Sequence, residues 1–183
     1  VTRLRWHEDG WPTMEPVALN PRPGTHVEAT FSPDAPLDGE WITPRRLPEQ
    51  VSDRTTRPGW LVLQSDGSTL DDPRPVFVGR RQEHLTQATS VDLDCTAGVG
   101  GLAVRYDENF HVEVEAGGGR VVARANVSGL VQEWVASVDS DRVTVHIDSR
   151  RPAMERGFAR TSDVFHLGAT VAGRRIDLAE VDG

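Results

Sequence analysis

Apolar and polar residues alternate with a period of two along much of the chain. The clearest examples are residues 110–115 and 142–148, in which every second side chain is apolar. Successive side chains of a strand point to opposite faces of a sheet, so the alternation predicts strands with one buried and one solvated face. Further strands are expected at 27–31, 60–63, 75–78, 91–94, 102–106, 121–127, 164–168 and 176–178.

Turn-forming residues separate these segments, with the clearest signals at 65–68, 71–73, 117–119 and 171–173. Only residues 130–137 are a candidate for a helix, of about two turns. Many short strands with regular turns favour an all-β fold, a sandwich or a barrel of antiparallel strands. The alternation argues against a parallel α/β sheet, whose strands are buried on both faces.

Residues 1–24 differ from the rest because they combine Trp6 and Trp11 with four prolines. Proline is rare in central strands. We therefore expect a tail or linker that docks through its tryptophans, followed by one domain over residues 25–183.

Charge and composition exclude several function classes. All 20 basic residues are arginine, and the 28 acidic residues give a net charge of −8. An acidic chain is a poor partner for nucleic acid or for an anionic membrane. No apolar run approaches the roughly 18 residues of a membrane span. Cys95 is the only cysteine, so no internal disulfide forms, and its strand-like surroundings predict a buried, inert thiol. Neutral ligands such as sugars remain compatible.

His111, Glu113 and Glu115 lie on one face of a predicted strand. Alternate residues are about 6.5 to 7 Å apart, and the paired carboxylates of glycosidases are roughly 5 to 9.5 Å apart. Such a pair needs a cleft that separates its pKa values, so the polar face of an exposed strand is the favoured interpretation. Two side chains do not make a metal site, and no nucleophile elbow or phosphate loop is present. The sequence predicts no catalytic residue and no cofactor, and it leaves a structural cation such as calcium open.

Five polar or charged residues follow the expected strand at 75–78: Arg80, Arg81, Gln82, Glu83 and His84. Their donors and acceptors suit sugar hydroxyls, and functional side chains often lie on loops. On composition alone, a polar strand edge tied down by ion pairs is the more ordinary explanation.

Several segments together resemble the C-terminal domain of family 43 β-xylosidases and α-L-arabinofuranosidases. The resemblance covers residues 3–182. It is carried by Asp9-Gly10-Trp11-Pro12, Phe31-Ser32-Pro33, Trp41, Arg45-Arg46, Arg57-Pro58-Gly59-Trp60-Leu61, Val78-Gly79-Arg80-Arg81-Gln82-Glu83-His84 and Gly101-Leu102.

This resemblance implies a concanavalin A-like (jelly-roll) sandwich of two antiparallel sheets with little helix. In the family this domain packs on a five-bladed catalytic propeller, which holds the catalytic acid and base, and helps to close the sugar pocket. The chain alone is therefore expected to be inactive, with the Arg80–His84 loop facing the pocket. Leu85 stands where the family often has an aromatic residue. The resemblance also implies one or more final strands after Gly183.

The implied partners are the propeller and, through it, xylo- or arabino-oligosaccharides; the propeller decides between the two specificities. A homo-oligomer is also compatible with the sequence, and a bacterial cytoplasmic location is favoured. One alternative is a free-standing carbohydrate-binding module or lectin-like domain. Another is a sandwich glucanase with Glu113 and Glu115 as its catalytic pair, although the strand lacks the Glu-x-Asp-x-x-Glu arrangement of those enzymes.

Overall fold

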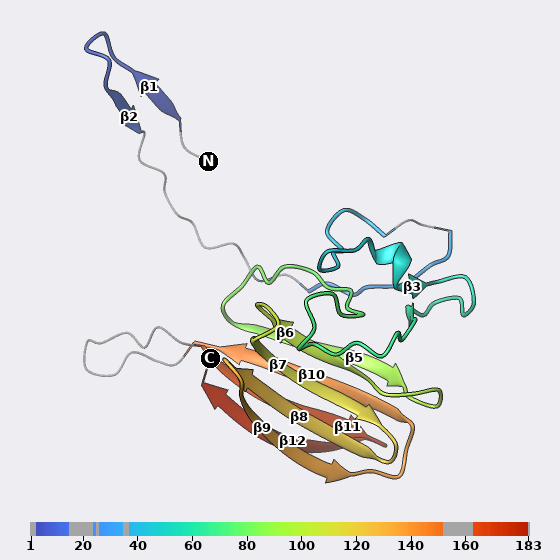
Figure 1. Cartoon of the computed structure of the whole chain (residues 1–183). Coiled ribbons are helices and arrows are strands. Elements are labelled where there is room, and N and C mark those ends of the chain that lie inside the picture. The colour runs from blue at the N-terminus through green and yellow to red at the C-terminus, as the bar shows by residue number, and fades with distance from the viewer. Residues whose placement is uncertain (1–2, 15–23, 25, 35–36, 152–162, 183) are drawn as a thin grey trace.

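The computed structural model describes residues 3–14, 24, 26–34, 37–151 and 163–182 (Figure 1). Its elements are almost all strands. They are β1 (Leu4–Trp6), β2 (Pro12–Met14), the 3-10 turn η1 (Pro48–Gln50), β3 (Ser52–Asp53), β4 (Val62–Leu63), β5 (Gln87–Asp94), β6 (Gly100–Arg105), β7 (Phe110–Gly117), β8 (Arg120–Val127), β9 (Leu130–Ser137), β10 (Arg142–Arg150), β11 (Val164–Val171) and β12 (Arg174–Asp182). No helix within the described ranges is long and apolar enough to cross a membrane.

Two four-stranded sheets form the body of the protein. One has the order β12-β11-β10-β5 and the other the order β6-β7-β8-β9, and neighbouring strands are antiparallel throughout. Strands of the first sheet contact strands of the second, so the sheets stack face to face (Figure 1). The predicted antiparallel sandwich is confirmed.

The alternating apolar side chains meet between the two sheets. Val114 and Val121 on one sheet and Val145 and Ala169 on the other have no measurable exposure. Burying a valine or leucine side chain stabilises the fold by roughly 1.5 to 3 kcal/mol. Cys95 belongs to the same core cluster, where burial raises the pKa of its thiol. The burial of Cys95 expected from the sequence is confirmed, and its inertness stays a prediction.

The helix expected at 130–137 is wrong, because these residues form strand β9. Each of them pairs with a residue of β8, from Val127↔Leu130 to Arg120↔Ser137. Apolar residues at 130, 131, 134 and 135 follow a helical period better than strict alternation, because 130 and 131, like 134 and 135, are adjacent. Pairing with β8 and the packing of Trp134 on the core decide the outcome.

The strands expected at 27–31 and 75–78 are also wrong, and 60–63 forms a strand only at Val62–Leu63, paired with β3. Phe31 makes an isolated bridge to Gly59, and Gly79 makes one to Ile42. Residues 37–80 instead form what we call the loop layer, an irregular cover beside the sandwich (Figure 1). It buries a few residues of its own, among them Val51 and Pro75.

Part of the expected N-terminal tail is a hairpin, since β1 pairs with β2 from Leu4↔Met14 to Trp6↔Pro12. Proline is tolerated here because each strand of a two-stranded sheet is an edge. Trp6 and Trp11 remain 67% and 75% exposed. Residues 15–23 of the expected linker lie outside the described ranges.

Candidate functional site

The Arg80–His84 loop lies between the Gly79–Ile42 bridge and the start of β5. Gln82 anchors it to the sandwich, because its side-chain amide donates to Ser149 Oγ at 3.3 Å and to the His84 carbonyl at 2.6 Å. Ser149 Oγ in turn donates to the Leu85 carbonyl at 3.1 Å. Ser149 is next to last in β10, so the loop is fixed at the end of the sandwich where β10 finishes.

Arg80 is exposed, but its side chain also contacts the loop layer. Its guanidinium forms an ion pair with Glu40 and lies 5.6 Å from the ring centroid of Trp41. Trp41 also packs against Phe31, with ring centroids 5.4 Å apart. A hollow of about 250 Å³ beside these rings is lined partly by Arg80 and Arg54. Arg80 therefore both packs within the loop layer and lines this hollow.

The other four residues of the loop are described by their solvent exposure and their partners. Arg81, Gln82 and Glu83 are exposed and His84 is half-buried. Among the described residues, the Arg81 guanidinium has no hydrogen-bond or ion-pair partner. The structure thus brings all five predicted residues to one end of the sandwich, but holds Arg80 and Gln82 in internal contacts. That they line a sugar pocket stays a prediction.

The same end of the sandwich carries exposed apolar side chains that sequence reasoning missed. Phe110 pairs with Val127, and Val127 pairs with Leu130, so these residues lie at one end of their sheet. The end of β6 lies there too, since Arg105 pairs with His111. We call the following set the apolar rim: Leu85 (50% exposed), Tyr106 (88%), Phe110 (42%), Val127 (46%) and Leu130 (78%).

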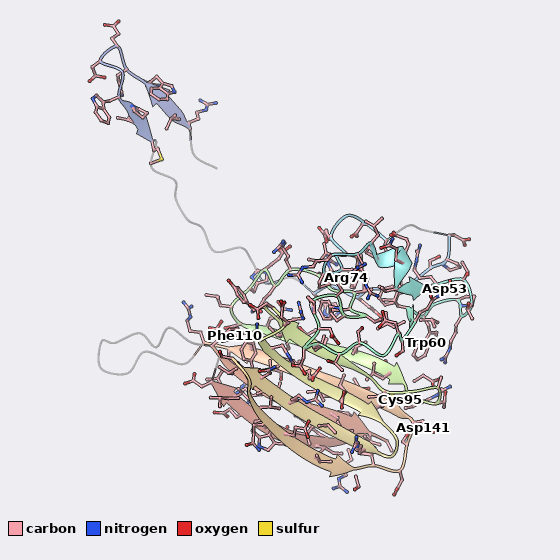
Figure 2. All side chains as sticks on the ribbon, viewed as in Figure 1. Asp53, Trp60, Arg74, Cys95, Phe110 and Asp141 are labelled. Carbon is pink, nitrogen blue, oxygen red and sulfur yellow. The ribbon has the colours of Figure 1, made fainter. Side chains whose placement is uncertain are left out.

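The rim and the Arg80–His84 loop share one end because β5 runs away from the loop to Asp94, and a short turn leads back into β6. Figure 2 shows this arrangement: Phe110 is labelled at one end of the sandwich, and Cys95 and Asp141 at the other. At that opposite end, Val99 is the exposed large apolar residue of the described turns. Phe110, Val127 and Leu130 sit at strand ends, and Leu85 and Tyr106 lie outside the strands, so the period-two pattern, which put Phe110 on a buried face, does not predict their exposure.

The interpretation of His111, Glu113 and Glu115 as an exposed polar face is wrong for the first two. His111 is 4% and Glu113 7% exposed, although both point away from the core. Arg124 covers Glu113 and donates to it at 2.8 Å. Desolvation raises the pKa of Glu113, and the positive charge of Arg124 only partly opposes this.

Arg124 joins three strands of the sheet. Besides Glu113 on β7, it contacts Glu133 on β9 at 2.8 Å and Glu115 on β7 at 3.9 Å. The two carboxylates considered as a catalytic pair therefore share one guanidinium. Neither Glu113 nor Glu115 lines the hollow beside Phe31 and Trp41 or a second hollow over β10, β11 and β12. This arrangement suits a structural ion-pair network better than a pair that needs a cleft.

No group of three or more His, Cys, Asp or Glu among the described residues is placed to hold a metal ion. The second hollow, of about 330 Å³, lies over β10, β11 and β12. Its polar lining is internally paired, since Arg175 contacts Asp177 at 2.8 Å and Asp148 at 3.7 Å. The structure thus offers polar surfaces but no assembled catalytic centre within the ranges it describes.

Comparison with known protein families agrees with this geometry. The family model for the beta xylosidase C-terminal concanavalin A-like domain matches residues 28–176. Neither the curated proteins nor the solved structures gave a match. The matched stretch covers the loop layer, the Arg80–His84 loop and the strands up to β12. The chain therefore belongs to the family of C-terminal concanavalin A-like domains of family 43 β-xylosidases.

Proposed function

We propose that this chain is the accessory domain of a family 43 glycoside hydrolase, where it packs on the catalytic propeller and helps to close its sugar pocket. The observation that carries the proposal is the position of the apolar rim beside the Arg80–His84 loop. An apolar surface and a set of hydrogen-bonding side chains at one end suit a contact with another domain that also borders a polar ligand.

The rim supports the contact with the propeller. A tyrosine that is 88% exposed and a leucine that is 78% exposed leave apolar surface in water, and clustered exposed apolar side chains mark interaction sites. The hairpin of β1 and β2 supports it as well. A two-stranded hairpin is at best marginally stable alone, and Trp6 and Trp11 are available to pack on a partner. Residues 9–12 resemble the segment at which the propeller of the family passes into the sandwich, and this favours the propeller as that partner.

The loop supports the role at the sugar pocket. The Arg81 guanidinium carries five N–H donors and faces solvent, so it is available to a sugar hydroxyl from the propeller side. Gln82 holds the loop on Ser149 and leaves Arg81 pointing outward. In this proposal the catalytic acid and base come from the propeller, and this chain binds and encloses substrate without taking part in bond cleavage. Xylosides and arabinofuranosides are the substrates that the family suggests.

The test uses the parent enzyme with Arg81→Ala and, as a matched control, Arg142→Ala. Arg142 is also an exposed arginine, with its side chain 75% exposed, but it lies at the opposite end and contacts Asp94 at 3.7 Å. Arg81→Ala should raise KM or lower kcat several-fold on nitrophenyl xyloside or arabinofuranoside, while the melting temperature stays unchanged. Kinetics of Arg81→Ala equal to those of Arg142→Ala would contradict the proposal.

The hollow over β10–β12 favours a second candidate, a carbohydrate-binding module. Its lining residues Asp148, His166, Arg175 and Glu180 offer donors and acceptors, but the lining has no Trp, Tyr or Phe for stacking on a sugar. Since sites for small ligands bury most of the ligand surface, we expect the isolated chain to bind xylobiose weakly or not at all. Submillimolar binding in calorimetry, lost in Arg175→Ala, would support the module instead.

A further inference from the structure

Three polar residues on neighbouring strands form one row across the outer face of the β6-β7-β8-β9 sheet. Arg105 on β6 pairs with His111 on β7, and His111 pairs with Asn126 on β8. All three side chains contact the same short segment of the loop layer, residues 70–72. We call this row and its contacts the polar clamp.

The contacts of the clamp converge on Asp71 and its two neighbours. Asp71 Oδ1 accepts from His111 Nε2 at 3.0 Å and from Asn126 Nδ2 at 2.6 Å. Arg105 donates to the backbone carbonyls on either side, to Leu70 at 3.3 Å and to Asp72 at 3.1 Å. One carboxylate oxygen and two carbonyls therefore hold this segment to three strands.

Burial makes these contacts matter more than an ordinary surface ion pair. The His111 side chain has no exposed surface and that of Arg105 is 7% exposed. Leaving a buried donor unpaired costs more free energy than a hydrogen bond normally contributes. The other ring nitrogen of His111, Nδ1, already lacks a partner, so the ring depends on Nε2, which contacts Asp71 at 3.0 Å and, more weakly, Asn126 Nδ2 at 3.5 Å. Displacing residue 71 would leave the ring and the Asn126 amide buried without their acceptor.

The clamp is linked to the Arg80–His84 loop by a short, bonded stretch of chain. Arg45 donates to the Pro73 carbonyl at 3.1 Å, and the Val76 amide donates to Ser68 Oγ at 3.1 Å. Gly79 then exchanges two backbone hydrogen bonds with Ile42, at 2.8 and 2.9 Å. A Cβ at residue 79 would stand 2.6 Å from the Phe77 ring, so this stretch is also tightly packed.

We propose that Asp71 is a positioning residue: through the polar clamp it fixes the loop layer on the sheet and thereby sets the conformation of the Arg80–His84 loop. The importance of that loop for sugar binding rests on the proposed function above. The positioning itself does not, because it is a property of this chain alone. Loss of the clamp should loosen residues 80–84, nine or more positions away from the substitution.

The experiment is amide hydrogen exchange on the chain with Asp71→Ala, Asp71→Asn and Asp177→Ala. Asp71→Ala removes the shared acceptor and should speed exchange of the Gly79 amide, which donates to the Ile42 carbonyl at 2.9 Å just before the loop, about tenfold. Asp71→Asn keeps a carbonyl oxygen for His111 and Asn126 and should restore most of the protection. Asp177 is an exposed carboxylate on the other sheet, paired with Arg175 at 2.8 Å, so its variant should match the wild type.

Unchanged exchange of the Gly79 amide with Asp71→Ala would overturn the proposal, even if residues 66–73 exchange faster. Arg105→Gln is the second variant, since it weakens the contacts with Leu70 and Asp72 but leaves Asp71 in place; it should speed exchange of the Gly79 amide as well. Kinetics of the parent enzyme with Asp71→Ala separate the two proposals. Faster exchange with an unchanged KM would refute the role of the loop in sugar binding and leave the clamp established.

Discussion

The Arg124 guanidinium donates to the Glu113 carboxylate at 2.8 Å on the outer face of a sheet, yet the Glu113 side chain is only 9% exposed. The pair lies on adjacent strands in direct register, Glu113↔Arg124. It therefore ties β7 to β8 where the sequence alone suggested solvent. Removing one partner of a buried ion pair leaves the other charge buried and uncompensated, which destabilises the fold.

Arg124→Ala should destabilise the chain by about 2 to 3 kcal/mol, because Glu113 is then left buried without its partner. The pKa of Glu113 is already raised in the fold by burial. A carboxyl with a raised folded-state pKa weakens the fold as pH rises above its unfolded value of about 4.3. The loss in Arg124→Ala should thus be larger at pH 8 than at pH 5, as measured by urea unfolding.

Glu133→Ala serves as the control for this prediction. Its carboxylate meets the same guanidinium at 2.8 Å but is 47% exposed, so its removal should change stability by about 0.5 kcal/mol or less. If Arg124→Ala and Glu133→Ala destabilised the chain equally and without pH dependence, Glu113 would be a solvated carboxylate after all.

The chain alone should not hydrolyse nitrophenyl xyloside or nitrophenyl arabinofuranoside. Glu113 and Glu115 are the two carboxylates considered as a catalytic pair, and Arg124 contacts both of them, at 2.8 and 3.9 Å. A general acid must be free to donate its proton to a substrate held within hydrogen-bond reach. Turnover by the purified chain that disappears in Glu113→Gln would demonstrate a catalytic centre of its own.

The sequence predicted well those strands whose pairing agrees with a period-two pattern. Residues 110–115 and 142–148 alternate cleanly, and both are central strands with a buried inner face. It failed at 130–137 because Leu130, Val131, Trp134 and Val135 follow a helical period rather than alternating. Pairing with the neighbouring strand β8 overrides that local pattern.

The candidate site was predicted in part for a similar reason. The Arg80–His84 segment was recognised from its residues, and the structure places it at one end of the sandwich. The partners of its residues could not be foreseen, because Ser149 is 67 positions from Gln82. The polar clamp joins Asp71 to His111 across 40 positions, and the burial of His111 follows from that contact rather than from its own strand.

Asp94 should make the stability of the fold depend on pH in the acidic range. Hydrogen bonds from Thr96, and the ion pair with Arg57 at 2.9 Å, lower the pKa of Asp94 to about 2. A carboxylate with a depressed folded-state pKa stabilises the fold above its unfolded value of about 3.9, and this contribution is lost as pH falls toward 2. Asp94→Asn should therefore lower the melting temperature at pH 7 and do so much less at pH 2.5.

Asp139→Asn is the matched control for Asp94, since Asp139 is exposed in the turn before β10. It should leave the melting temperature within about one degree at both pH values. A melting temperature of Asp94→Asn that follows this control at pH 7 would show that the contacts with Thr96 and Arg57 contribute nothing measurable.

Two neighbouring glycines on strand β6, Gly100 and Gly101, differ in the space that they leave for a Cβ atom. A Cβ at residue 101 would stand 2.5 Å from the Val114 carbonyl oxygen and 2.9 Å from the Glu115 Cα, both of which are backbone atoms. Nothing lies within 4 Å of a Cβ at residue 100. Forced overpacking typically costs about 1 to 3 kcal/mol, so Gly101→Ala should destabilise by that amount and Gly100→Ala should not. Equal urea midpoints for the two variants would contradict this packing.

The apolar rim should promote self-association of the isolated chain, whereas in the parent enzyme it should contact the propeller. In the isolated chain Tyr106 and Leu130 are 88% and 78% exposed, so Tyr106→Ser and Leu130→Ser remove little buried contact. Together they should reduce self-association in analytical ultracentrifugation without lowering the melting temperature. Val99→Ser, at 62% exposure and at the opposite end, is the control and should alter neither property.

In the parent enzyme, the double variant Tyr106→Ser and Leu130→Ser would remove apolar contact with the propeller. There it should lower the unfolding temperature of the sandwich or separate its transition from that of the propeller, since contact between domains couples their unfolding. A parent enzyme whose unfolding is the same for the double variant and for Val99→Ser would mean that the propeller packs elsewhere on the sandwich.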